Sequence, residues 1–322
     1  MLHDTHAHLE MLLEKLDILT LADKDDFNPL YEYAFARQAL DSLLQNHEFI
    51  IQATTSTKNF LLTRKLFGYN PKVKFIIGSH PEIVDNHFIV NDYLNQQKEL
   101  LLEHGLLQNT PTGGLELITG VNPQDSEPTD SAGDKHNLES DDFEQTQIVG
   151  LGECGLDYHY TEDQEVIGKQ WVLFESQLSL AAYLNLPLIV HMRDSFADTI
   201  AIVQKFPQMH SRLLFHCFSQ DLSELEEVLG LGGYISIGGV LTFKNAEKLR
   251  QVIQACPLDR LLIETDLPFL SPTPHRGKVC LPAYIDHVAQ EIATLKNLTT
   301  AEVWDKLKKN SLQFSKKFCI SF

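Results

Sequence analysis

The sequence lacks any hydrophobic run approaching the ~18–20 residues that a membrane-spanning helix requires. Its N-terminus has no basic segment followed by an apolar one, so we find no secretory signal. Cysteine is scarce: the five residues are an odd number without a CxxC pair, which favours free thiols in a reducing compartment and argues against a zinc ribbon. We therefore expect a cytoplasmic protein with no membrane partner.

Positive charge is also in short supply. The chain has 26 lysines and arginines against 44 aspartates and glutamates, a net charge of −18. Such a chain does not attract nucleic acid through its overall field. Any polyanion must therefore be held locally, by metal ions or by a small basic patch.

What is present indicates one large α/β domain over residues 1–322, of which 43% are hydrophobic. Short apolar segments alternate with amphipathic stretches, and continuous apolar runs are typical of parallel strands buried on both faces. This rhythm predicts a (β/α)8 TIM barrel, with an open doubly wound sheet as the alternative. The expected strands are residues 2–6, 49–54, 73–79, 148–153, 188–191, 213–216, 234–237 and 261–265.

Two polar stretches interrupt this rhythm. Residues 17–29 lengthen the first loop, and residues 110–147 carry nine acidic residues against one lysine. The longer stretch has few of the apolar residues that a core of its own would need. We interpret residues 110–147 as an acidic, mobile insertion within the barrel domain.

Several expected strands end in residues that can bind metal. His6 and His8 are two residues apart, so strand periodicity places both imidazoles on one face. Alone, this pair is weak support for a metal site. The fourth, fifth, sixth and eighth strands end near Glu153, His191, His216 and Asp266, respectively. Because the carboxyl ends of barrel strands surround one site, we expect these six side chains to converge on a metal centre.

The motifs around these residues, taken together and in order, resemble those of the TatD-type metal-dependent deoxyribonucleases, an amidohydrolase-like barrel family. The matching segments are DTHAHL (4–9), GECGLDY (152–158), LIVHMR (188–193), FHCFS (215–219), IETDLP (263–268), PHRGK (274–278) and PAY (282–284). The likeness extends over residues 1–317, interrupted by the two acidic stretches. The sequence departs from the family pattern at Glu82, where a second histidine is common.

The resemblance implies two divalent ions, of zinc, manganese or magnesium. One is held by His6, His8, Glu153 and Asp266, and the other by Glu153, His191 and His216, with Glu153 as the bridge. Catalytic roles then fall to Glu153 and to Asp266, which orients a water molecule or accepts its proton.

Three further residues are candidates for binding substrate phosphate. By resemblance His80 lies at the rim, with a hydrogen-bonded turn histidine as the alternative. Arg193 is two residues beyond His191 and can meet a phosphate or form a structural ion pair. Arg276 follows the eighth strand, where barrels often bind phosphate, although a solvated loop is equally consistent.

These features lead us to expect a hydrolase that cleaves phosphodiester bonds in DNA from single-stranded or frayed ends, with RNA as another possible substrate and no obligate protein partner. Two alternatives stay open. One is hydrolysis of an ester or amide on the same metal pair, such as removal of a D-amino acid from tRNA. The other is a non-catalytic, metal-dependent binding protein.

Overall fold

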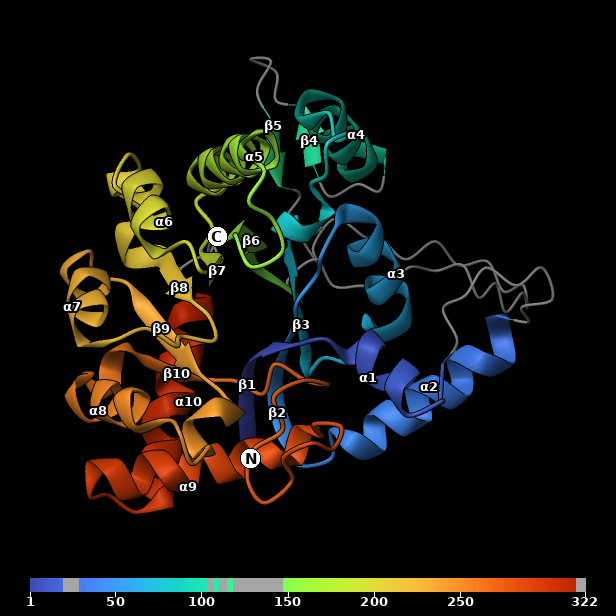
Figure 1. Cartoon of the computed structure of the whole chain (residues 1–322). Helices are drawn as coiled ribbons and strands as arrows, with labels where there is room; N and C mark the ends of the chain where they lie inside the picture. Colours follow the sequence, from blue (N-terminus) through green and yellow to red (C-terminus); the bar gives the residue numbers. More distant parts are fainter. Residues whose placement is uncertain (20–28, 104–106, 110–114, 118–146, 317–322) are drawn as a thin grey trace, which may run out of the picture.

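Eight parallel strands form one sheet in the order β1-β2-β3-β6-β7-β8-β9-β10. The computed structural model describes residues 1–19, 29–103, 107–109, 115–117 and 147–316 (Figure 1). The strands are β1 (Leu2–Ala7), β2 (His47–Gln52), β3 (Val73–Ile77), β6 (Ile148–Asp157), β7 (Leu188–Arg193), β8 (Leu213–Phe215), β9 (Tyr234–Ile237) and β10 (Leu261–Ile263). All eight lie where the hydrophobic pattern predicts them. Strand β6 continues four residues beyond Glu153, so this carboxylate lies within a strand rather than at its end.

The sheet closes on itself beyond the regular strand ladder. The backbone N–H of Asp266 donates to the carbonyl oxygen of His6 at 3.0 Å, and that of His8 donates to Leu267 at 2.9 Å. These bonds join the segment after β10 to the end of β1. The fold is therefore the predicted (β/α)8 barrel, and the open doubly wound alternative is wrong.

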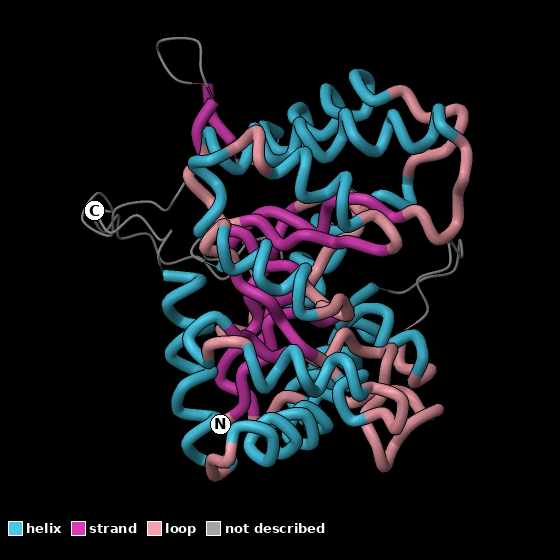
Figure 2. The backbone as a smooth tube through the Cα atoms, turned by 60° about the vertical axis from the view of Figure 1, so that its left-hand side comes forward, coloured by secondary structure: helices cyan, strands magenta, loops and turns pink. Residues whose placement is uncertain are grey.

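Helices surround the strands on the outside (Figures 1 and 2). They are α1 (Leu9–Lys15), α2 (Pro29–Leu43), α3 (Thr57–Phe67), α4 (Val90–Glu103), α5 (Gln164–Tyr183), α6 (Phe196–Val203), α7 (Leu222–Gly230), α8 (Glu247–Ala255), α9 (Ile285–Lys296) and α10 (Thr300–Lys316). Short 3-10 turns include η1 (Pro81–Ile83) and η4 (Gly239–Thr242). None of the described helices is both long and apolar enough to cross a lipid bilayer.

Alternation along the strands separates two hydrophobic layers. One layer fills the barrel interior, where Ile51, Ile189 and Leu214 pack together. Their neighbours Ile50, Val190 and Phe215 belong to the larger layer between the strands and the helices. The same alternation turns His191 and His216 inward, two residues beyond Ile189 and Leu214.

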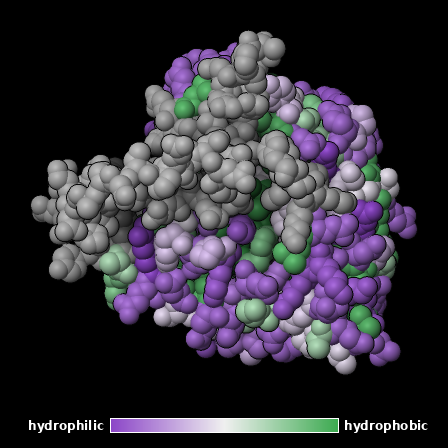
Figure 3. Space-filling model, turned by 180° about the vertical axis from the view of Figure 1, so that it is seen from behind, coloured by the Kyte–Doolittle hydropathy of each residue, from purple (hydrophilic) through white to green (hydrophobic). Residues whose placement is uncertain are grey.

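Helix α10 covers the opposite end of the barrel from the site. Its Phe314 joins the interior layer against Tyr234, with ring centroids 5.5 Å apart. The Asn310 amide donates to the carbonyl oxygens of Leu258 and Leu261, where β10 begins. From behind, the described surface is mainly hydrophilic with small, separate hydrophobic areas, as expected for the outer faces of helices around a buried barrel (Figure 3).

Little of the acidic stretch 110–147 belongs to the described structure. Strand β5 (Leu115–Leu117) pairs antiparallel with β4 (Leu107–Asn109), a hairpin that the sequence did not indicate. At the other end Gln147 is buried, and its amide donates to the carbonyl oxygens of Asn70 and Val73. Residues 118–146, like 20–28 in the first polar stretch, lie outside the described residues, so the mobility of the insertion stays a prediction.

Candidate metal centre

Four ligand atoms from three distant segments meet at the mouth of the barrel. Glu153 Oε2 lies 3.1 Å from His6 Nε2 and 3.6 Å from His8 Nε2. Asp266 Oδ1 lies 3.8 and 3.7 Å from the same two nitrogens. Ligands placed tetrahedrally at Zn–N and Zn–O distances of about 2.0–2.1 Å are roughly 3.3 Å apart, so this spacing fits one cation.

The protonation states of these groups are compatible with a bound cation. Burial lowers the pKa of His6, and it lowers that of His8 to about 3, so both imidazoles are neutral at pH 7. Burial alone would raise the pKa of Glu153, but the neighbouring imidazole of His216, whose own pKa is raised well above its usual value, holds that of Glu153 well below its usual range. An ionised carboxylate and neutral imidazoles are the forms of these side chains that bind divalent cations.

The other oxygen of Glu153 faces a second group of histidines. Glu153 Oε1 is 2.7 Å from His191 Nδ1 and 2.8 Å from His216 Nε2, and these two nitrogens are 3.2 Å apart. His80 Nε2 lies 3.5 Å from the same oxygen. The two carboxylate oxygens therefore face different sets of ligand atoms. The structure brings together all six candidate ligands and His80, and the set fits divalent cations.

The backbone of β6 is shaped to bring Glu153 beside His191. Gly155 has a φ of +153°, and a Cβ there would collide with the carbonyl oxygen of His191. Only glycine allows β6 to run this close to β7. The close approach aligns Gly155 with His191 and Asp157 with Arg193 in the strand register.

Buried carboxylates support the two histidines of the second group. Asp157 Oδ2 lies 3.1 Å from His191 Nε2, and its Oδ1 accepts the backbone N–H of His159 at 2.9 Å. Glu264 Oε1 lies 3.8 Å from His216 Nδ1. Glu264 also accepts the Cys217 N–H and the Ser236 hydroxyl. Its oxygen lies close enough to His6 and His216 for these three residues to be a further group that could hold a metal ion.

Asp4 joins the two chain segments that carry the first group. Its carboxylate accepts the backbone N–H and the hydroxyl of Thr265, at 3.1 and 2.6 Å, and also the backbone N–H of His6. Strand parity alone would direct Asp4 towards the metal ligands, but a register shift in β1 accompanies its contact with Thr265. Asp4 thereby fixes His6 and Asp266 relative to each other.

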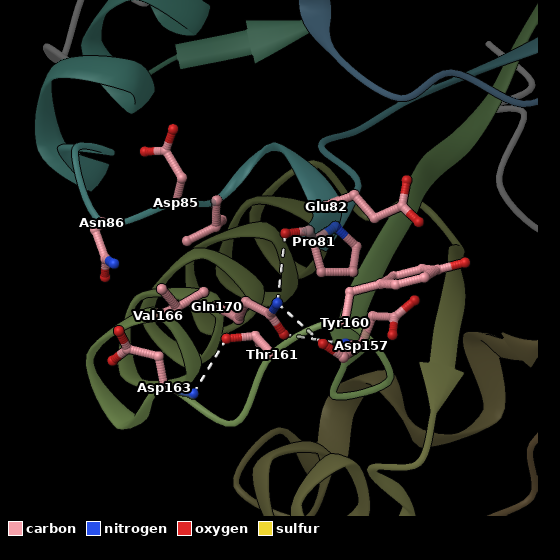
Figure 4. Close-up of a pocket in the computed structure, with 11 residues that line it drawn as sticks. Pro81, Glu82, Asp85, Asn86, Asp157, Tyr160, Thr161, Asp163, Val166 and Gln170 are labelled. Carbon is pink, nitrogen blue, oxygen red and sulfur yellow. Dashed lines mark hydrogen bonds between the residues drawn. The ribbon is translucent and has the colours of Figure 1, made fainter.

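A cavity of about 560 Å³ opens beside the second group. Asp157 lines it and connects it to His191, while Tyr160, Pro81 and Glu82 stand on the same side (Figure 4). Of its lining residues four are acidic and none is basic: Glu82, Asp85, Asp157 and Asp163. This cavity therefore disfavours a phosphate group.

The two predicted arginines stack on aromatic rings. The Arg193 guanidinium lies 5.0 Å from the centroid of the Tyr160 ring and donates to its hydroxyl at 3.2 Å. That of Arg276 lies 4.2 Å from the centroid of Phe243. His80 is more central, and its Nδ1 accepts the backbone N–H of Glu82, which places the proton on Nε2, facing Glu153.

Sequence reasoning missed Asp157 and the exposed aromatic residues at the mouth. Asp157 could have been found, since it shares strand parity with Glu153 four residues earlier. Tyr160 and Phe269 lie in loops where no periodicity applies. Their position near the ligands follows from the fold alone.

Comparison with known proteins agrees with this geometry. The profile of the family described as "TatD related DNase" matches residues 3–316. The metal-dependent hydrolase YcfH of Escherichia coli K12 is 40% identical over 300 residues, which cover 93% of this chain and 90% of that protein. The metal-dependent hydrolase BU355 of Buchnera aphidicola is 31% identical, over 92% of this chain and 91% of its own length.

Solved structures show the same fold. The TatD homologue YJJV of E. coli superposes with a TM-score of 0.69 at 23% identity, covering 97% of both chains. A TatD-family hydrolase of Entamoeba histolytica gives a TM-score of 0.65 at 18% identity, again covering 97% of both chains.

Proposed function

Since the chain belongs to the TatD-related DNase family and is a metal-dependent hydrolase, we propose that it hydrolyses phosphodiester bonds in DNA, beginning at a single-stranded or frayed end. The observation that carries the proposal is the position of Glu153, whose two oxygens face two separate sets of ligand atoms. Such a carboxylate can bridge two cations, an arrangement suited to in-line displacement at phosphorus.

In this proposal His6, His8, Glu153 and Asp266 hold one divalent ion, and Glu153, His191 and His216 hold the other; zinc, manganese and magnesium all suit these ligands. When bound, the cations supply positive charge that polarises a phosphoryl oxygen and activates a water molecule. The remaining steps fall to side chains of the chain itself.

Asp266 is placed to orient the attacking water and accept its proton. It is the more exposed of the two central carboxylates, with 15% of its side chain accessible against 4% for Glu153. His80 presents its Nε2–H beside Glu153 Oε1 and can donate to a non-bridging phosphate oxygen. Arg193 and Arg276 bind flanking phosphates from the rim. No covalent intermediate is needed.

The preference for an end follows from charge. A chain with a net charge of −18 can hold one or two phosphates at the mouth, but it has no basic stripe along which a long duplex would bind. We expect RNA to be a poorer or equal substrate, and neither a membrane nor another protein to be required. A cytoplasmic location is part of the same proposal.

One observation favours a second candidate function. The acidic cavity beside His191 would accept the ammonium group of an aminoacyl ester rather than a phosphate. Hydrolysis of such an ester, as in removal of a D-amino acid from tRNA, would use the same cations and the same carboxylates.

The test compares linear and covalently closed single-stranded DNA, RNA and a D-aminoacyl ester of tRNA, each with and without divalent ions. Loss of linear DNA with the closed circle intact supports the proposal, whether or not RNA is also cleaved. Equal degradation of the closed circle excludes dependence on an end, and ester hydrolysis with DNA intact supports the second candidate. Asp266→Asn keeps the size of the side chain but removes its basicity, and should lower the rate roughly 10²–10⁴-fold. Near-normal turnover would refute the role of Asp266.

A further inference from the structure

Two large hydrophobic side chains stand exposed directly after the metal-ligand candidate Asp266. Phe269 is 47% exposed and Leu270 38% exposed. Their loop is held firmly, because the Phe269 N–H donates to the Asp266 carbonyl and the His8 N–H donates to that of Leu267. The exposed ring is thus fixed to the same backbone that positions two of the ligands.

The Phe269 ring lies at the edge of the ligand cluster. Among the described residues it meets one other ring, that of His8, with centroids 6.4 Å apart and the planes nearly perpendicular. His8 in turn faces Glu153 and Asp266. Other exposed large hydrophobic residues, such as Phe35 on α2 or Val172 on α5, lie on outer helices. An isolated exposed side chain needs no explanation, but a rigid ring beside a reaction centre does.

We infer that Phe269 is the platform on which the base of the terminal nucleotide stacks while its phosphodiester lies at the cluster. This inference rests on the proposed DNA hydrolysis and names how its substrate is held. Stacking on an aromatic ring suits any base, since every base has a π face, and it contributes about 1–3 kcal/mol per base.

The two sides of the mouth differ in a way that directs the strand towards Phe269. On the cavity side the Tyr160 ring is already covered by Arg193, and four carboxylates line the cavity itself. On the other side the loop of η4 packs directly on Leu270. The backbone of Gly239 lies so close to the Leu270 carbonyl oxygen that a Cβ at this position would collide with it. That loop leads to Phe243, on which Arg276 stacks.

The hydroxyl of Thr242 accepts the Thr273 N–H at 2.8 Å and ties the two loops together. The loop that carries the exposed ring of Phe269 also carries Arg276, and it is tied to the loop of Phe243 on which Arg276 stacks. A nucleotide strand needs this pairing of an apolar face with a cation.

The experiment uses two single-stranded oligonucleotides, identical except that one has tetrahydrofuran abasic residues at both ends, so that strand polarity does not matter. The wild type should have the lower KM for the oligonucleotide with terminal bases. Phe269→Ala should raise that KM about 5- to 150-fold and leave the KM for the abasic one unchanged. Metal content per chain and kcat should stay near wild type.

Three further variants separate stacking from other effects. Phe269→Tyr keeps an aromatic face and should keep the preference, whereas Phe269→Leu keeps apolar bulk and should lose it. Phe35→Ala removes a phenylalanine on α2 that is 59% exposed, more than Phe269, and should change neither KM. If Phe269→Ala or Phe269→Leu keeps the preference for terminal bases, the inference is wrong while the proposed function stands. If the wild type cleaves neither oligonucleotide, the proposed function fails and the inference falls with it.

Discussion

Replacing Asp157 by asparagine should weaken metal binding by removing the group that sets the protonation of His191. Both oxygens of Asp157 act as acceptors, one for the His159 N–H at 2.9 Å and one facing His191 Nε2 at 3.1 Å. Burial would raise the pKa of Asp157, but its hydrogen bond to His191 lowers it below its usual value and keeps it ionised. Asp157 thus favours a proton on His191 Nε2, and Nδ1, 2.7 Å from Glu153, is the nitrogen of His191 that would bind a cation.

Asparagine has the same shape but only one acceptor. If the asparagine oxygen still accepts the His159 N–H, the asparagine NH₂ group faces His191 Nε2. This stabilises the tautomer of His191 in which the proton is on Nδ1, the atom that would bind the metal. Loss of a partner of this kind typically lowers metal affinity by about 10–100-fold. That range corresponds to roughly 1.4–2.7 kcal/mol.

The assay is titration of the metal-free protein with zinc or manganese by calorimetry, together with the metal content per chain. Asp163→Asn is the matched control, since Asp163 lines the same cavity but caps α5 through the Glu165 N–H. Asparagine caps helices equally well, so this variant should bind metal like the wild type. Equal affinity of the Asp157→Asn and Asp163→Asn proteins would refute the proposed role of Asp157.

Three other predictions concern substrate, stability and the insertion. Arg276→Ala should raise the KM for a single-stranded oligonucleotide about tenfold and change kcat less, because the arginine positions phosphate; a fall in kcat at constant KM would contradict this. Burial lowers the pKa of His47 from 6.5 to about 4, so the folded state resists protonation and His47 reduces stability as the pH falls from 6.5 towards 4. The free energy of unfolding of the wild type should decrease from pH 7 to pH 5, and His47→Leu should make this decrease smaller by roughly 2 kcal/mol, measured by urea denaturation. If the variant shows the same pH dependence as the wild type, His47 is not the cause. Replacing residues 118–146 by a short Gly-Ser linker should leave metal content and melting temperature near wild type, whereas unfolding of the barrel would show that the insertion is structural.

Local patterns in the sequence were sufficient to predict the eight barrel strands and to single out the candidate ligand residues. Runs such as Leu188-Ile189-Val190 favour buried parallel strands because both faces of such a strand need apolar side chains. Residues such as His191 and His216 stand out because a polar group after such a run is costly without a partner. Hence the eight strands, the barrel and the six candidate ligands could all be named in advance.

The tertiary structure decided how these residues meet. Glu153 faces His6 with one oxygen and His191 with the other only because the barrel closes between β10 and β1 and because β6 runs close beside β7. Strand register and closure depend on contacts between segments far apart in the chain, which short-range periodicity does not encode. The same reason applies to Asp157 as the partner of His191 and to the exposure of Phe269 beside His8: periodicity orients a side chain within its strand, but its neighbours are set by packing of the whole barrel.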